Sequence, residues 1–286
     1  MSVPSFQAYA SLAARRPPGP APRVSIITVC LDAAATLERC IASVQAQTFA
    51  DLEHVVVDGG SRDGTVDLVR RRLRPRDYWI SERDAGISDA FNKGLALARG
   101  AYVQFLNADD WMEPDQVARA VSALERTGAD YVFGDLLFYQ DDRPTFRLCG
   151  DGRYARCIDR RMPNLNHPTL LARRDCFARI GLFDPDWRCA MDYDWLLRLH
   201  RAGGRGWYEP GLLGHMTHDG VSNRQFRRTI DEVCRIAIRH GRPPLLARAE
   251  AGCRLVKTLL AQPVKSAAFP VYQRLRALIN RSYLPI

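Results

Sequence analysis

Short apolar runs alternate with amphipathic segments through the first half of the chain, and this alternation limits the possible folds more than any other feature. Residues 24–30, 54–58, 102–106 and 130–133 are apolar runs rich in β-branched or aromatic residues, as expected for strands buried on both faces. Between the first two runs, residues 37–44 place apolar side chains at i, i+3, i+4 and i+7, the spacing of an amphipathic helix. Repeated strand–helix alternation predicts an α/β fold with a mostly parallel sheet flanked by helices.

The termini have a different character from this central region. Residues 1–22 are rich in Ala, Arg and Pro and lack the apolar core of a signal peptide, so they are predicted to be a disordered leader. Residues 23–223 are predicted to form one folded domain. Residues 224–286 are predicted to form a basic amphipathic helical tail.

The positive charge of the chain lies almost entirely in that tail. Residues 224–286 contain 13 Lys/Arg and 3 Asp/Glu, whereas the remainder contains 28 basic and 29 acidic residues. Apolar stripes accompany the basic residues, which predicts that 242–286 binds an anionic membrane surface. An alternative is that these helices pack on the domain or form a dimer face. No recognised nucleic-acid-binding module accompanies the basic residues, so nucleic acid is not an expected partner.

The composition also bears on the cellular location. No stretch approaches the ~18 consecutive apolar residues of a membrane-spanning helix. The eight cysteines are scattered without a Cys-x-x-Cys pair, which is typical of reduced thiols in a cytosolic protein. We therefore expect a cytoplasmic protein that associates peripherally with the inner face of the cell membrane.

The run 102–106 leads directly into two carboxylates, Asp109 and Asp110. Ligands of open α/β sheets bind at the carboxyl ends of the strands. Because Mg²⁺ is usually held by one or two carboxylates together with substrate phosphates, this placement predicts a divalent ion that bridges the protein and a nucleotide diphosphate. The alternative is a surface turn with two solvated aspartates.

Three ordered segments resemble the family 2 glycosyltransferases, which are nucleotide-sugar enzymes with the GT-A fold, and most closely the bacterial members that build polysaccharides and glycolipids. The segments are VVVDGGSRDGT at 55–65, FLNADD at 105–110 and AMDYDWLLRL at 190–199. The resemblance implies a GT-A domain over 23–223, with a nucleotide-sugar half at 23–112 and an acceptor half at 113–223. The chain departs from the family pattern at Leu31-Asp32, where members often have Tyr-Asn, and at Asn107, where many have Asp.

The resemblance also implies a binding site for the nucleotide-sugar donor. Asp58 would accept hydrogen bonds from the base or ribose, with capping of its own loop as the alternative. Asp109 would hold Mg²⁺ or Mn²⁺, because Asn107 adds no charge and more plausibly hydrogen-bonds the nucleotide sugar. Lys93 would face the diphosphate, or else be a solvated helix residue. The full implied donor set is Thr28, Val29, Asp58, Asp84, Asp89, Lys93, Asn107, Ala108 and Asp109.

Asp192 is the predicted catalytic base. Inverting transfer needs a group that takes the proton of the acceptor hydroxyl from the side opposite the leaving diphosphate, and Asp192 matches the family's catalytic position. Asp194 is the rival; it could instead orient the acceptor or cap the helix. His167 and His218 are expected near the acceptor, with structural packing as the alternative for His167.

These expectations describe an inverting, metal-dependent glycosyltransferase that moves a sugar to a hydroxyl of a glycan or lipid-linked acceptor, with a UDP-sugar as the expected donor. A dinucleotide-dependent oxidoreductase is disfavoured because no Gly-x-Gly-x-x-Gly follows the first strand. A non-catalytic, nucleotide-binding relative of the fold is disfavoured by the presence of both Asp109 and Asp192.

Overall fold

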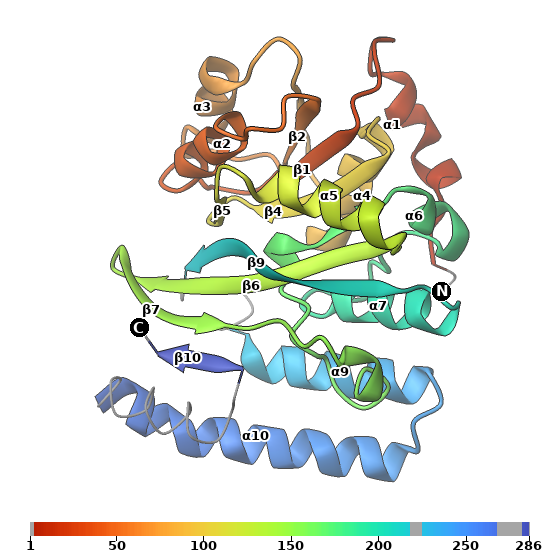
Figure 1. The fold of residues 1–286 in the computed structure, drawn as a ribbon, viewed down its shortest axis with the longest axis vertical. Coiled ribbons are helices and arrows are strands. Elements are labelled where there is room, and N and C mark those ends of the chain that lie inside the picture. Colours follow the sequence, from red (N-terminus) through yellow and green to blue (C-terminus); the bar gives the residue numbers. More distant parts are fainter. Residues whose placement is uncertain (1–2, 218–224, 268–281, 286) are drawn as a thin grey trace.

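The sheet is built around four parallel strands from the first half of the chain (Figure 1). A computed structural model describes residues 3–217, 225–267 and 282–285. The four strands are β1 (Val24–Cys30), β2 (Leu52–Asp58), β3 (Tyr78–Ser81) and β4 (Tyr102–Asn107), in the spatial order β4-β1-β2-β3. Every residue of β1 and β2 is buried, which confirms the prediction drawn from their continuous apolar sequence.

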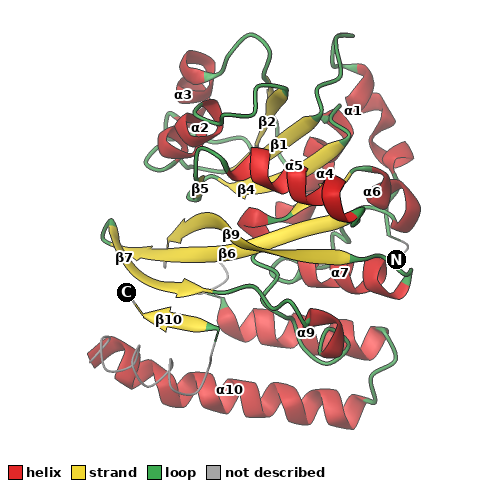
Figure 2. Cartoon of the chain, viewed as in Figure 1, coloured by secondary structure: helices red, strands yellow, loops and turns green. Residues whose placement is uncertain are grey.

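Helices cover both faces of this sheet (Figure 2). The helices α2 (Leu37–Gln45), α3 (Thr65–Arg72) and α5 (Gln116–Thr127) pack on one face, where they bury Val24, Ile26 and Val56. The helix α4 (Ile87–Leu97) packs on the other face with Ile27 and Val55. Because successive strand residues point to opposite faces, both faces carry a hydrophobic core.

The second half extends the same sheet with mixed strand directions. The short strand β8 (Leu171–Arg173) is antiparallel to both β4 and β6 (Tyr131–Gln140), and it separates them. The predicted hairpin is formed by β6 and β7 (Arg143–Leu148), and the strand predicted at 130–133 is the first part of β6. The long strand β9 (Gly206–Thr217) runs parallel to β6 and pairs with β5 (Trp111–Met112). Two helices, α6 (Asp175–Ile180) and α7 (Met191–Arg201), lie between β8 and β9 in the chain.

The prediction of a disordered leader over 1–22 is wrong for residues 6–16. A 3₁₀ turn η1 (Phe6–Tyr9) and a short helix α1 (Ala10–Ala14) pack against α4, and Leu12 is buried in the core. Arg16 forms a buried ion pair with Glu53. The Ala/Arg/Pro composition hid one apolar side chain and one buried cation, which together hold this segment on the domain.

The predicted boundary at 223 is also corrected, because the last part of the chain belongs to the body of the protein. The helix α9 (Phe226–Arg239) buries Ile230, Val233 and Ile236, and α10 (Pro244–Ala267) packs on α9. The strand β10 (Tyr283–Pro285) then pairs with β7 at the edge of the sheet. The charge excess suggested a separate tail, although the apolar side of α9 supplies ordinary core contacts. None of the helices in these described ranges is long and apolar enough to cross a membrane.

Candidate active site

Two loops at the carboxyl ends of β1 and β2 are fastened to each other. The amide of Asp32 donates to Ser61 Oγ at 2.7 Å, and the amide of Arg62 donates to Asp32 Oδ1 at 2.8 Å. Asp32 has a left-handed backbone with φ of 49°, which Asp and Asn tolerate better than most other residues. Asp32 can therefore adopt the same left-handed backbone as the asparagine that members of the family often have at this position.

Asp58 organises the loop that follows β2. It is fully buried, and its Oδ2 accepts hydrogen bonds from the amides of Gly60 at 3.1 Å and Ser61 at 3.0 Å and from Ser81 Oγ at 2.6 Å. Its Oδ1 accepts a hydrogen bond from Ser61 Oγ. These bonds occupy most of the acceptor capacity of a carboxylate. The loop-capping alternative therefore describes Asp58 in this structure, and its contact with the base or ribose stays a prediction.

Thr28 and Val29 lie inside the sheet rather than at its open edge. Thr28 pairs with Val56 on one side and Leu106 on the other, and its hydroxyl lies 2.9 Å from His54 Nε2. Val29 is likewise flanked by β2 and β4. The contact of these two residues with the donor remains a prediction. Leu31, with 61 % of its surface exposed, is the first residue beyond the strand.

Asp84 lies at the edge of the sheet where Gly59 follows β2. Asp84 Oδ1 accepts the amide of Gly86 at 2.8 Å, and a Cβ on Gly59 would lie only 2.6 Å from Asp84 Oδ2. Gly86, with φ of 123°, adopts a backbone that favours glycine. Two glycines thus allow a carboxylate to approach the end of β2, as the predicted donor site requires.

Lys93 and Asp89 form an internal network on α4. Lys93 is buried; its Nζ donates to the carbonyl of Arg83 at 2.7 Å and lies 3.1 Å from Glu82 and 3.7 Å from Asp89. Asp89 also accepts the hydroxyl of Tyr9 at 2.7 Å. These partners hold the β3–α4 loop and Lys93 is not a solvated helix residue, while its contact with a diphosphate stays a prediction.

The two carboxylates that follow β4, Asp109 and Asp110, lie in different environments. Asp110 is buried, accepts Asn107 Nδ2 at 2.9 Å, and leaves Oδ1 without a partner among the described residues. Burial and then the charge of Asp109 raise the pKa of Asp110 well above its usual range. Asp109 is partly exposed, and Thr217 Oγ1 lies 3.5 Å from its Oδ2. Ala108, between Asn107 and Asp109 in the sequence, is buried and packs with the core.

A divalent cation fits this motif only with help from a ligand. No group of three His, Cys, Asp or Glu side chains among the described residues could hold a metal by itself. Asp109 offers an accessible carboxylate, and the buried Asp110 beside it has an oxygen without a partner among the described residues. A Mg²⁺ or Mn²⁺ ion bound there would complete its ligands with phosphate oxygens. His218 lies outside the described residues.

Asp192 stands in the first turn of α7 and has no side-chain partner among the described residues. Its Oδ1 accepts only the amide of Tyr193, at 2.8 Å. Burial raises the pKa of Asp192 to about 6, and the charge of Glu232 adds to the effect. An unpaired carboxylate with a pKa near the working pH has the properties of a general base.

The loop before Asp192 is held from the C-terminal helix α9, which sequence reasoning missed. Glu232 is buried, and its carboxylate accepts the amides of Cys189 at 2.7 Å and Ala190 at 3.0 Å, with the amide of Arg188 also within reach. The sequence held no signal that singled out Glu232, because an acidic residue in a helix is normally exposed. Charge-assisted bonds to successive amides fix the start of α7.

The same loop reaches the donor side. Ser88 Oγ in the first turn of α4 donates to the carbonyl of Trp187, and Arg188 Nε lies 4.0 Å from where a Cβ on Gly86 would stand. Arg188 is an exposed cation beside the Asp84–Gly86 loop. Sequence reasoning could not single out Arg188, because arginine makes up nearly all of the basic residues.

Asp194 and His167 have structural environments. Asp194 is buried, with Arg198 Nε at 2.8 Å and His240 Nε2 at 3.2 Å. Although burial alone would raise it, the pKa of Asp194 is lowered by His240 and Arg198. His167 stacks on Phe105 with ring centroids 5.6 Å apart, and burial lowers its pKa to about 4. The structure thus shows an ion-paired Asp194 and a packed His167, and the expected acceptor contacts of these two residues stay predictions.

Comparison with known proteins agrees with this geometry. The sequence model described as glycosyl transferase family 2 matches residues 25–183. A PGL/p-HBAD biosynthesis glycosyltransferase of Mycobacterium bovis is 36% identical over 183 residues, covering 62% of this chain and 70% of that protein. The succinoglycan biosynthesis protein ExoO of Rhizobium meliloti is 29% identical over 218 residues, covering 70% of this chain and 63% of that protein.

Solved structures share the fold. The mannosyltransferase PcManGT from Pyrobaculum calidifontis, in complex with GDP-Man and Mn²⁺, has a TM-score of 0.62 at 22% identity and covers 95% of this chain and 90% of its own. Staphylococcus aureus TarS 1–349 in complex with UDP-GlcNAc has a TM-score of 0.56 at 17% identity. The match covers 75% of this chain and 66% of that chain. The chain therefore belongs to glycosyl transferase family 2 and is a nucleotide-sugar glycosyltransferase of the GT-A fold.

Proposed function

We propose that this enzyme transfers a sugar from a UDP-sugar to a hydroxyl group with inversion at the anomeric carbon, and that Asp192 is the base. The observation that carries the proposal is the state of Asp192: a half-buried carboxylate, free of side-chain partners among the described residues, with a pKa of about 6. Asp194, the only rival in the motif, is already paired with Arg198 and His240.

In the proposed reaction, Asp192 takes the proton of the acceptor hydroxyl as its oxygen attacks the anomeric carbon. The bond between that carbon and the diphosphate oxygen breaks, and the electron pair leaves with the nucleoside diphosphate. A base in the first turn of a helix is positioned by rigid backbone, and Glu232 holds the preceding loop by its amides. Arg188, which lies beside Gly86, is the nearest described cation of this loop to the donor side.

Asp109 is the proposed protein ligand of Mg²⁺ or Mn²⁺. Such an ion neutralises charge on a departing diphosphate. Asp109 is accessible whereas Asp110 is buried and bonded to Asn107, so one carboxylate of the motif can reach an ion and the other shapes the turn. The uridine preference is supported by the resemblance and by the UDP-GlcNAc complex of a neighbour in fold, while another neighbour binds GDP-Man.

Titration calorimetry tests the donor proposal. UDP should bind the enzyme more tightly with Mn²⁺ than with EDTA, and GDP should bind more weakly than UDP. A hydrolysis screen over UDP-sugars and GDP-sugars, read by release of the nucleoside diphosphate, then identifies the sugar. Tighter binding of GDP, or hydrolysis of GDP-sugars alone, would reject the uridine assignment and leave the proposed base unaffected.

The proposed acceptor is a glycan or lipid-linked sugar at the inner face of the cell membrane. The support is the exposed apolar side of α10, where Val256 and Leu260 are 55% and 72% exposed, next to the basic residues of that helix. The apolar residues between 269 and 279, which belong to the expected membrane-binding segment 242–286, lie in the part of the chain that the structure does not describe.

A further inference from the structure

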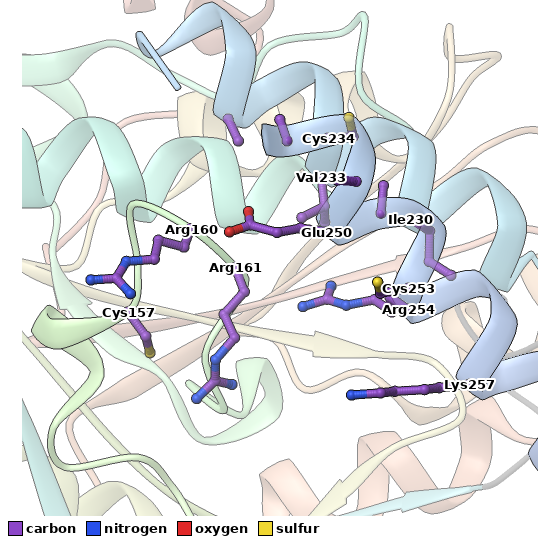
Figure 3. A pocket seen from close by; sticks show the side chains of 14 residues that line it. Cys157, Arg160, Arg161, Ile230, Val233, Cys234, Glu250, Cys253, Arg254 and Lys257 are labelled. Carbon is purple, nitrogen blue, oxygen red and sulfur yellow. The ribbon is translucent and has the colours of Figure 1, made fainter. Parts of the chain in front are cut away.

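A cavity of about 550 Å³ lies between α9, α10 and the loop at 157–161, outside the candidate active site (Figure 3). Its apolar part comes from the two helices, including Ile230, Val233, Ala237 and Ala247. Its remaining lining is rich in cations: Arg160, Arg161, Arg254 and Lys257. A hollow that joins an apolar wall to a group of cations has the composition of a site for an anionic amphiphile.

The charges of this cavity are poorly balanced by the protein. Its one carboxylate, Glu250, is paired with Arg242 at 2.5 Å, and the only ion-pair partner of Arg161 among the described residues is Asp151, at 3.7 Å. Arg254 has no hydrogen-bonded or ion-paired side-chain partner among the described residues, although it is partly buried. Figure 3 shows Arg254 and Lys257 reaching from α10 toward the side of the cavity where Arg161 lies.

Arg254 is the residue that most needs an external anion. Burial lowers its pKa, and the neighbouring guanidinium of Arg161 lowers it further. Arginine nevertheless keeps its proton in proteins, so Arg254 and Arg161 both stay positively charged. Their repulsion near a partly buried position is relieved only when an anion binds. A guanidinium pair offers several donors in a planar arrangement, which suits the oxygens of a phosphate.

We propose that this cavity binds the phosphate head group and first carbons of a membrane amphiphile, with Arg161 and Arg254 on the phosphate and the walls of α9 and α10 on the chain. The position supports a membrane source. The cavity is lined by residues of α10, and the same helix exposes Val256 and Leu260, so a bilayer that binds α10 would lie close to the cavity. The proposal does not depend on the donor or base assignments.

Calorimetry with the full chain and dodecyl phosphate below its critical micelle concentration tests the proposal, with inorganic phosphate and dodecyl maltoside as separate arms. Dodecyl phosphate should bind, and Arg254→Gln and Arg161→Gln should each weaken it about tenfold, as expected for loss of a charge-assisted bond. Arg248→Gln is the matched control, since Arg248 is an exposed arginine of α10 that does not line the cavity. Octyl phosphate should bind more weakly than dodecyl phosphate.

Each contrary result rejects a defined part of the proposal. Equal binding of inorganic phosphate and dodecyl phosphate would make this a simple anion site. Equal binding of dodecyl maltoside would remove any role for charge. An equal loss in Arg248→Gln would reduce the effect to general electrostatic attraction. UDP affinity, measured on the same variants, should stay unchanged, so a failed donor assignment and a failed amphiphile site give different results.

Discussion

The carboxylate of Glu232 accepts the backbone amide of Ala190 at 3.0 Å, two residues before Asp192. Its bond to the amide of Cys189 is shorter, at 2.7 Å, and the guanidinium of Arg228 lies 3.0 Å from its other oxygen. The geometry of the proposed base thus depends on a residue of the C-terminal helix α9, which lies beyond the region matched by the family model.

Glu232→Gln is predicted to lower turnover about tenfold and to move the acidic limb of the pH–rate profile to lower pH. The negative charge of Glu232 raises the pKa of Asp192, so removing that charge lowers the pKa and keeps the base deprotonated in more acidic solution. Asp231→Asn, a change at the exposed neighbouring position of α9, is the control. A lower turnover with an unmoved limb would leave Glu232 with a purely structural role.

Asp192→Asn is predicted to lower turnover by ~10²–10⁴-fold while donor affinity stays nearly unchanged. Asparagine can still accept the amide of Tyr193 but cannot take a proton. In the unmodified enzyme, turnover should fall as the pH drops through about 6, because protonation removes the base. Weaker UDP binding with normal turnover would place Asp192 on the donor side instead.

Asp194→Asn is predicted to act mainly on stability. Asp194 is 1% exposed and bonded to Arg198 and His240, and removing one partner of a buried pair costs about 3 kcal/mol. Because the pKa of Asp194 is lowered in the folded protein, its contribution is complete above the ordinary pKa of aspartate, and it is lost as the pH falls through the folded value. Denaturant unfolding checks this; a catalytic loss larger than that of Asp192→Asn, in protein that stays folded, would move the base to Asp194.

Asp109→Ala is predicted to abolish transfer and remove the Mn²⁺-dependent part of UDP binding while leaving the fold intact. Asp109 is partly exposed, and its one close side-chain contact among the described residues is Thr217, at 3.5 Å. Asp110→Asn is the contrast, since the raised pKa of Asp110 favours the neutral form that asparagine resembles. Near-normal turnover of Asp109→Ala in EDTA-treated buffer would reject the metal assignment.

The double variant Val256→Gln with Leu260→Gln is predicted to reduce flotation with anionic liposomes, because both side chains are exposed on α10. A truncation after His240 would be a poor test, since it also removes β10 with its buried Tyr283. Trp207→Gln changes an exposed apolar residue of β9 and serves as the control. Flotation that is unchanged, or insensitive to salt, would exclude a membrane role for this helix.

The sequence was most informative where burial was uniform. The strands β1 and β2 were predictable because burial on both faces requires continuous apolar residues. The strand β8 spans three residues, too few for a periodic signal. It nevertheless lies between β4 and β6 and is antiparallel to both, so the sheet is no longer purely parallel from this point.

The sequence motifs predicted which residues belong to the site, but they did not predict which other residues contact them. Asp109 and Asp192 follow from short local patterns. The roles of Asp58, Lys93 and Asp194 depend on Ser81, Glu82 and His240, which tertiary packing brings to them. Glu232 could not be identified from the sequence, because an acidic residue in a helix is normally exposed.

The pairing of β10 with β7 changes the meaning of the basic segment that precedes it. That segment begins at α9, which is fastened to the loop before α7, and its other end is fastened to the edge of the sheet. A membrane contact made by α10 would therefore be a rigid attachment and not a flexible tether. It would fix the angle at which the active site faces the bilayer. An acceptor held in the membrane would then meet the enzyme from one direction.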